Sequence, residues 1–194
     1  MSSIATIGPA GSDCYQAACQ YAPNPDLILF HKLSDIIKAF RKGEVDYALI
    51  PVYNTREGEV KEYFRLISQM EEGYWIDNIV LPISLSLGML KNKKTPPSAI
   101  STIVGRGSVF RQCWDCIEDN FPDATLMAVK DIEQAVQEIT QQQKVDHAVI
   151  DSEKLLEKYG FDLVAREVVS HNRTRFAIVG KNPSPLTGYD ATAI

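Results

Sequence analysis

The sequence predicts an α/β protein of two lobes, each built on a mostly parallel sheet. Short apolar segments alternate with helical segments along the chain, an order that places helices on the faces of parallel strands. The chain also contains an internal echo, a pattern that occurs twice. Each copy reads as an amphipathic helix, a polar turn and a buried strand, the first over residues 35–40 and 45–50 and the second over residues 131–136 and 145–150. Two such copies favour two similar lobes over a solenoid, which needs a shorter repeated period.

Composition limits the classes of partner. The 194 residues are 45% hydrophobic and 23% charged, as in ordinary globular proteins. A net charge of −5 offers no basic surface for a phosphate backbone, so we expect no nucleic-acid partner. The chain starts without a charged and apolar leader, and no apolar run approaches the roughly 20 residues of a membrane span. We therefore expect a cytoplasmic protein with no membrane partner.

The first lobe is expected over residues 1–80. Its predicted strands cover residues 4–7, 27–30 and 47–50. Each strand is followed by a helical stretch, and Ser34 is a plausible N-cap for the second helix. A third helix is predicted around residues 63–70.

The second lobe is expected over residues 81–170. An apolar run at residues 79–90, broken by Pro82, is the candidate crossover between lobes, and the polar residues 91–97 are a linker candidate. A strand at residues 100–104 precedes a helix at 109–121. The last predicted strand lies within residues 171–181 and returns to the first lobe, and residues 182–194 form a tail without a core pattern.

Three loops share a design suited to an anion. Residues 8–12, 54–58 and 105–108 each place small or hydroxyl residues between a strand end and a helix start, where backbone N–H groups lack helical partners. The carboxyl ends of strands are also where open α/β sheets bind ligands. For any one loop, Ser12 or Ser108 as an ordinary N-cap is the simpler interpretation. Together, the loops favour a small carboxylated ligand.

Several motifs resemble one family in the right order. They are Gly8-Pro9-Ala10-Gly11-Ser12, Gly43-Glu44-Val45-Asp46-Tyr47, Pro51-Val52-Tyr53-Asn54-Thr55-Arg56-Glu57-Gly58, Val80-Leu81-Pro82-Ile83, Gln112-Cys113, Tyr159-Gly160 and Asn172-Arg173-Thr174-Arg175-Phe176. This set is similar to the catalytic domain of prephenate dehydratases and covers nearly the whole chain. The resemblance implies a two-lobed fold like that of type II periplasmic binding proteins, with an interlobe cleft.

The resemblance also implies an activity and a set of site residues. Family enzymes convert prephenate to phenylpyruvate, losing carbon dioxide and the ring hydroxyl. Thr174 would donate a proton to the departing hydroxyl, and no cofactor or metal is implied. The other implied catalytic positions are Asn54, Thr55, Gln112 and Glu133. The expected substrate-binding positions are Ser12, Tyr53, Arg106, Ser108, Arg175 and Phe176, where Arg175 either binds a carboxylate or braces the loop.

Two departures from the family pattern affect the expected chemistry. Tyr53 stands where the family has a glutamate, and Gly105-Arg106-Gly107-Ser108 replaces a usual Ser-His-Pro-Gln. Residues 186–194 resemble the first strand of the regulatory ACT domain that follows the family's catalytic domain, so we expect that regulation to be absent. These features favour a non-aromatising prephenate decarboxylase of a secondary-metabolite pathway. The alternatives are a prephenate dehydratase, a non-catalytic binding module, and a fragment of a larger regulated enzyme.

The cysteines carry a weaker signal. Cys113 and Cys116 have the spacing of a redox or zinc pair, and Cys14 with Cys19 would complete a four-thiolate site. Buried free thiols are the favoured interpretation, and no metal is expected. The expected partners are prephenate and, for assembly, a second copy of the chain in a homodimer.

Overall fold

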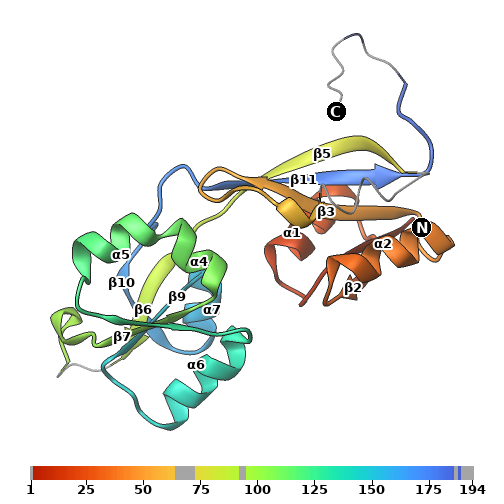
Figure 1. Ribbon diagram of the computed structural model, residues 1–194. Helices are drawn as coiled ribbons and strands as arrows, with labels where there is room; N and C mark the ends of the chain where they lie inside the picture. The colour runs from red at the N-terminus through yellow and green to blue at the C-terminus, as the bar shows by residue number, and fades with distance from the viewer. Residues whose placement is uncertain (1, 64–72, 92–94, 186–187, 189–194) are drawn as a thin grey trace. The chain divides into compact units, whose positions relative to one another are not determined.

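The computed structural model describes residues 2–63, 73–91, 95–185 and 188. The chain divides into two compact units, each of which combines helices with a sheet (Figure 1). Unit 1 comprises Met1–Pro82 and Arg173–Ile194, and unit 2 comprises Ile83–Asn172. The predicted two-lobed α/β class is therefore confirmed.

Unit 1 is built on a six-stranded sheet of order β2-β1-β3-β11-β5, with β4 paired to β3. Its elements are β1 (Ser3–Ile7), α1 (Asp13–Tyr21), β2 (Asp26–Phe30), α2 (Leu33–Lys42), β3 (Tyr47–Asn54), β4 (Gly58–Glu59), β5 (Tyr74–Pro82) and β11 (Arg173–Gly180). Strands β2, β1 and β3 run parallel, whereas β11 runs antiparallel to both β3 and β5.

Unit 2 has a five-stranded sheet of order β10-β6-β9-β7-β8. Its elements are β6 (Ser86–Leu90), the 3-10 helix η1 (Pro97–Ala99), β7 (Thr102–Gly105), α4 (Gly107–Gln112), α5 (Trp114–Asn120), β8 (Thr125–Ala128), α6 (Ile132–Gln141), β9 (His147–Asp151), α7 (Glu153–Lys158) and β10 (Phe161–Ala165). Strand β7 is parallel to β8 and β9, and β6 is antiparallel to β9 and β10.

Both sheets are mixed, because β11 in unit 1 and β6 in unit 2 run against the parallel strands. The reason is the path of the chain between the units. Strand β6 enters unit 2 and β11 returns to unit 1, and each runs against the parallel strands beside it. Each connection therefore enters its unit at the edge where the parallel strands end. In open α/β sheets this edge is where ligands bind.

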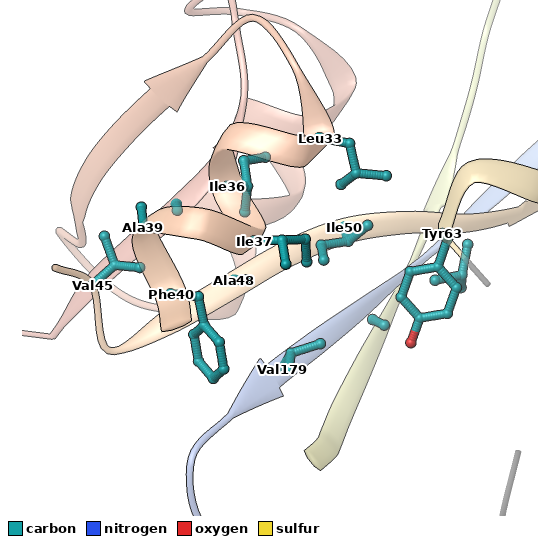
Figure 2. Packing of buried hydrophobic residues seen from close by; sticks show 13 residues of the cluster. Leu33, Ile36, Ile37, Ala39, Phe40, Val45, Ala48, Ile50, Tyr63 and Val179 are labelled. Atoms are coloured by element: carbon teal, nitrogen blue, oxygen red, sulfur yellow. The ribbon is translucent and has the colours of Figure 1, made fainter. Parts of the chain in front are cut away.

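Two apolar layers cover the faces of the unit 1 sheet. Helix α2 buries Leu33, Ile36, Ile37 and Phe40, a spacing that forms one stripe of a helix. Figure 2 shows this stripe packed against strand residues that include Ile50 and Val179. On the other face, Ala17 and Ala18 of α1 pack with Ile4, Leu49, Phe176 and Ile178. The unit 2 core joins α6 and α7 to its sheet, with Val136, Val149 and Leu156 at its centre.

Several local predictions are wrong in position. The helix predicted at residues 109–121 is divided into α4 and α5 because Cys113, buried between them, has φ −104° and ψ 9°. Helix α2 begins at Leu33, so Ser34 lies in its first turn and Lys32 is the N-cap. The described residues of the linker candidate, 91 and 95–97, belong to unit 2, after β6, and do not connect the units.

Some predictions fall on residues outside the described ranges. The helix predicted at 63–70 falls mostly on residues 64–72, and the ACT-like strand falls on residues 186–194, of which only Gly188 is described. Both stay predictions. Of the tail, Ser184 donates a hydrogen bond from its hydroxyl to the Ile76 carbonyl of β5, 2.8 Å away. Within the described ranges, no helix has the length and apolar character to cross a membrane.

The α2 layer should contribute strongly to stability. Phe40 is only 1% exposed, so Phe40→Ala would leave a cavity and lower the free energy of unfolding by about 3–5 kcal/mol. Ile28→Ala, at a side chain 36% exposed, is the matched control and should cost much less. Urea unfolding followed by circular dichroism measures both. Equal losses would contradict the assignment of Phe40 to the core.

Candidate functional site

A β-bulge in β3 sets the geometry of the candidate site in unit 1. Tyr53 pairs with Arg175, but Pro51 pairs with the next residue, Phe176, so Val52 is an extra residue in the ladder. An extra residue shifts the alternation of side chains by one position. Asn54 therefore lies opposite Thr174 and shares its face of the sheet. Regular alternation would have placed Asn54 on the α2 face, with Val52.

The side chains of Asn54 and Thr174 form a hydrogen bond. The Asn54 Nδ2 amide donates to Thr174 Oγ1 at 2.9 Å. Asn54 is 5% exposed, and its Oδ1 accepts from the backbone N–H groups of Arg56 and Glu57 at 2.8 and 3.1 Å. These two donors fix the amide orientation, so the nitrogen must face Thr174. Because Thr174 Oγ1 already accepts one hydrogen bond, its own hydrogen can be donated to a ligand.

Thr55 closes this end of the β3–β11 pair. Its backbone N–H donates to the Arg173 carbonyl, and its hydroxyl oxygen accepts from the Arg173 N–H, both at 2.9 Å. These bonds hold the segment on either side of Asn54 against the segment before Thr174. Thr55 therefore supports the Asn54–Thr174 pair through its hydrogen bonds to the Arg173 backbone.

The other expected binding residues of β3 and β11 lie elsewhere. Tyr53, 44% exposed, and Arg175, also exposed, are neighbours across the ladder on the face opposite to Thr174. Phe176 is fully buried in the α1-side core. It supports Thr174 from within the sheet and offers no surface to a ligand.

Ser12 is the N-cap of α1. Its hydroxyl oxygen accepts from the Tyr15 N–H, and the hydroxyl donates to the Ile7 carbonyl, both at 3.2 Å. The N-cap interpretation of Ser12 is confirmed. Ser108 lies within the first turn of α4, and Arg106 precedes this helix as its N-cap residue.

A partly buried ion pair forms the main charged feature of unit 2. Arg106 Nη2 lies 2.9 Å from Asp151 Oδ2, and the side chains are 38% and 5% exposed. The second carboxylate oxygen of Asp151 accepts from the Ser152 N–H at 2.8 Å. The register that pairs Val104 with Val149 brings the ends of β7 and β9 together, which places Arg106 beside Asp151.

Gly105 is required by packing. A Cβ atom at this position would lie 2.7 Å from Ile150 Cγ2, closer than real Cβ contacts allow, and 3.0 Å from Phe110 Cε1, which is a tight contact. The hydroxyl residue that the sequence comparison expected here has no room in this chain. Its replacement by glycine therefore has a structural reason, independent of any change in chemistry.

Gln112, at the end of α4, is held by Asn172. The Asn172 Nδ2 amide donates to Gln112 Oε1 at 2.8 Å, and Asn172 is buried. The Asn172 carbonyl accepts from the Ile83 N–H at 2.9 Å, so one residue joins both connecting segments to α4. This hydrogen bond fixes the orientation of the Gln112 amide.

Glu133, an expected catalytic position, is engaged by two neighbours. Its Oε2 accepts from the Tyr159 hydroxyl at 2.7 Å and from Lys158 Nζ at 2.9 Å. The hydrogen bond from Tyr159, followed by that from Lys158, holds the pKa of Glu133 below its ordinary value. Glu133 is thus an ionised carboxylate that ties α6 to the end of α7.

A cavity of about 290 Å³ lies beside α2 in unit 1. It is lined by Ile7, His31, Lys32, Leu33, Ser34, Pro51, Val60 and Glu62. None of the expected site residues lines it, and it lies on the α2 side of the sheet, away from Thr174. The candidate site in unit 1 is therefore defined by the hydrogen-bonded Asn54 and Thr174 side chains and not by this cavity.

The cysteines do not form a metal or redox centre in the described part of the chain. All four are free thiols, and no cluster of three or more His, Cys, Asp or Glu side chains is arranged to hold a metal ion there. Burial raises the pKa of the Cys14 thiol to about 12, so this thiol stays protonated and unreactive.

The structure thus brings Thr174, Asn54 and Thr55 together in unit 1. In unit 2, Gln112 is joined to Asn172 and Arg106 to Asp151, two partners that sequence reasoning did not select. Asp151 ends a buried strand, and the carboxyl ends of strands are where ligands bind in open α/β sheets. That signal was present in the sequence.

A family model described as prephenate dehydratase matches residues 4–184 of the chain. The chain belongs to the prephenate dehydratase family. It is 29% identical over 200 residues to a prephenate dehydratase of Amycolatopsis methanolica, a match that covers 100% of this chain and 64% of the relative. It is 25% identical over 180 residues to a prephenate dehydratase of Lactococcus lactis subsp. lactis (strain IL1403), covering 92% of this chain and 63% of the relative. The chain thus spans less than two thirds of these relatives.

A solved family structure has the same fold. The prephenate dehydratase of Arthrobacter aurescens, in complex with L-Phe, superposes with a TM-score of 0.75 at 21% identity, covering 96% of this chain and 63% of that one. This likeness confirms the two-lobed type of fold that the motifs implied.

The packing around Gly105 can be tested by substitution in this family member. Gly105→Ser would force Ile150 or Phe110 to move and should lower the free energy of unfolding by about 1–3 kcal/mol. Gly107→Ser is the matched control, because the nearest atom to a Cβ there is Arg111 Nη1 at 3.7 Å. Thermal unfolding compares the two variants. A fully stable Gly105→Ser protein would refute the close packing.

The Glu133 contacts predict a pH-dependent contribution to stability. Because the pKa of Glu133 is lowered in the folded protein, its stabilising effect is complete above the ordinary glutamate pKa of about 4.3 and is lost as the pH falls through the lower folded value. Glu133→Gln should therefore lower the melting temperature at pH 7. This difference from the unchanged protein should shrink progressively below pH ~4.3. Glu138→Gln, on the same helix, is the control. A Glu133→Gln deficit that persists unchanged in acid would contradict this role.

Proposed function

We propose that this chain is a lyase that converts prephenate to phenylpyruvate. The observation that carries the proposal is the hydrogen bond from Asn54 Nδ2 to Thr174 Oγ1. In the proposed reaction the ring carboxylate leaves as carbon dioxide, and its bonding electrons move through the ring to expel the hydroxyl group. The departing oxygen takes a proton from Thr174 and leaves as water. The substrate is the one that the family name implies, and the hydrogen bond to Asn54 supports Thr174 as the proton donor.

The Asn54 amide suits this step. As the Thr174 hydroxyl gives up its proton, negative charge develops on Oγ1, and a fixed N–H donor at 2.9 Å stabilises that charge. The backbone donors of Arg56 and Glu57 hold the amide in place before the reaction begins, so little reorganisation is needed. A carbonyl oxygen facing Thr174 would instead accept its hydrogen and oppose the transfer.

A second candidate is the non-aromatising prephenate decarboxylase favoured by the sequence. Its specific support is now Arg106, a cation at a position where the family usually has histidine. The other two sequence departures that favoured the decarboxylase, at Tyr53 and Gly105, now support it less. Tyr53 lies on the face opposite to Thr174, and Gly105 is explained by packing. The relatives described above are dehydratases, so we place dehydration first.

The product of the reaction tests the proposal. Purified protein should convert prephenate to phenylpyruvate, an aromatic product identified by its ultraviolet spectrum and mass. Thr174→Val removes the hydroxyl at nearly constant volume and should lower kcat by about 10²–10⁴-fold. Thr174→Ser should retain much of the activity, and Thr125→Val, a matched change on β8 in unit 2, should leave it unchanged.

Other outcomes separate the alternatives. A non-aromatic hydroxy-cyclohexadienyl pyruvate, formed equally well by Thr174→Val, would establish the decarboxylase. Prephenate that binds tightly in calorimetry but is not consumed would indicate a binding module. Prephenate that neither binds nor reacts would refute all three.

A further inference from the structure

We propose that Asp151 is a positioning residue that orients Arg106 to bind the pyruvyl carboxylate of the substrate. The proposal rests on the function proposed above and names a subsite within it. It starts from an unusual pairing. Asp151 is nearly buried, at 5% exposure, whereas its partner Arg106 is 38% exposed. The carboxylate is therefore fixed in the protein, and part of the guanidinium faces outward.

The donors of Arg106 are only partly used. Nη2 is bonded to Asp151, while the buried Nε has no hydrogen-bond partner among the described residues. An arginine has five N–H donors in a rigid planar fork, so one contact to Asp151 leaves others for a second acceptor. A carboxylate is the acceptor whose geometry matches such a fork. The exposed part of Arg106 is thus suited to a carboxylated ligand.

The backbone before Arg106 is closely packed. Its backbone follows Gly105, which is packed against Ile150 so closely that a Cβ atom would not fit. Ile150 immediately precedes Asp151, so the same contact aligns both members of the pair. Asp151 is held in turn by the Ser152 N–H at 2.8 Å. Arg106 is therefore ordered before a ligand arrives, which reduces the entropy lost on binding.

An electrostatic argument indicates which of the two carboxylates of prephenate Arg106 binds. The ring carboxylate loses its charge as carbon dioxide departs, so a cation bound to it would stabilise the ground state more than the transition state and slow the reaction. The pyruvyl carboxylate keeps its charge throughout. A cation bound there favours both states equally, which lowers KM without lowering kcat. The pyruvyl carboxylate is thus the group that Arg106 can bind without opposing decarboxylation.

Steady-state kinetics with prephenate tests the role of each residue. Arg106→Ala should raise KM roughly 10- to 100-fold, the range for a lost charge-assisted contact, with kcat little changed. Asp151→Ala should raise KM by a smaller factor, roughly three- to tenfold, because the cation remains but is no longer ordered. Asp151→Asn, whose amide oxygen still accepts from Nη2, should lie between Asp151→Ala and the unchanged protein. Asp162→Asn, in an exposed pair with Lys91, is the matched control.

Inhibition by phenylpyruvate identifies the carboxylate. This product retains the pyruvyl carboxylate and lacks the ring carboxylate, so its Ki should rise in Asp151→Ala by the same factor as KM. A raised KM with an unchanged Ki would assign Arg106 to the ring carboxylate and overturn the proposal. If KM and Ki both stay unchanged while the melting temperature falls, the pair is only a structural brace, and the proposal fails.

The subsite can also be judged apart from catalysis. If the unchanged protein does not turn over prephenate, the proposed function fails, but calorimetry with phenylpyruvate still measures the subsite. Binding to the unchanged protein that is weakened in both Arg106→Ala and Asp151→Ala supports the subsite. Binding of equal strength in all three proteins overturns it.

Discussion

The extra residue in β3 is the constraint on which the unit 1 site depends. Regular alternation would carry Ile50, Val52 and Asn54 on the same face, toward α2, and would separate Asn54 from Thr174. The bulge at Val52 reverses the alternation after that residue, so Val52 stays in the core and Asn54 meets Thr174. A bulge disrupts part of the ladder. Here the bonds between Thr55 and Arg173 restore pairing beyond it.

Unit 2 reaches a comparable result by packing. The close contact of Gly105 with Ile150 brings the ends of β7 and β9 together, and the next residue of each strand is a member of the Arg106–Asp151 pair. In both units, a backbone feature near the end of a strand places one buried polar side chain. In unit 1 the bulge in β3 places Asn54, and in unit 2 the contact of Gly105 with Ile150 places Asp151. That buried group then orients a more exposed one, Thr174 or Arg106. In our proposals, the buried member orders the exposed member, and the exposed member is the one that binds the ligand.

The sequence predicted much of this framework. Alternating apolar and helical segments, with the internal echo, predicted the two units, and the rule for strand ends selected the loops at residues 8–12, 54–58 and 105–108. Side-chain direction was not predictable, because alternation cannot show where a bulge falls. The family resemblance grouped Tyr53 and Arg175 with Thr174, although they lie on the opposite face. The break at Cys113 also escaped prediction, since the helical spacing of apolar residues continues through it.

In the reaction that we propose, the two polar pairs have different roles. Proton transfer from a threonine is difficult because its oxygen must carry negative charge, so the useful neighbour is a neutral donor such as the Asn54 amide. A cation beside Thr174 would stabilise that charge more strongly, but it would also attract the carboxylate that must leave. The charge of Arg106, in contrast, is partly balanced by Asp151. A cation restrained in this way can orient a carboxylate through its fork while adding little net positive charge. In the dehydration that we propose, the neutral donor serves the departing hydroxyl and the paired cation serves the carboxylate that stays.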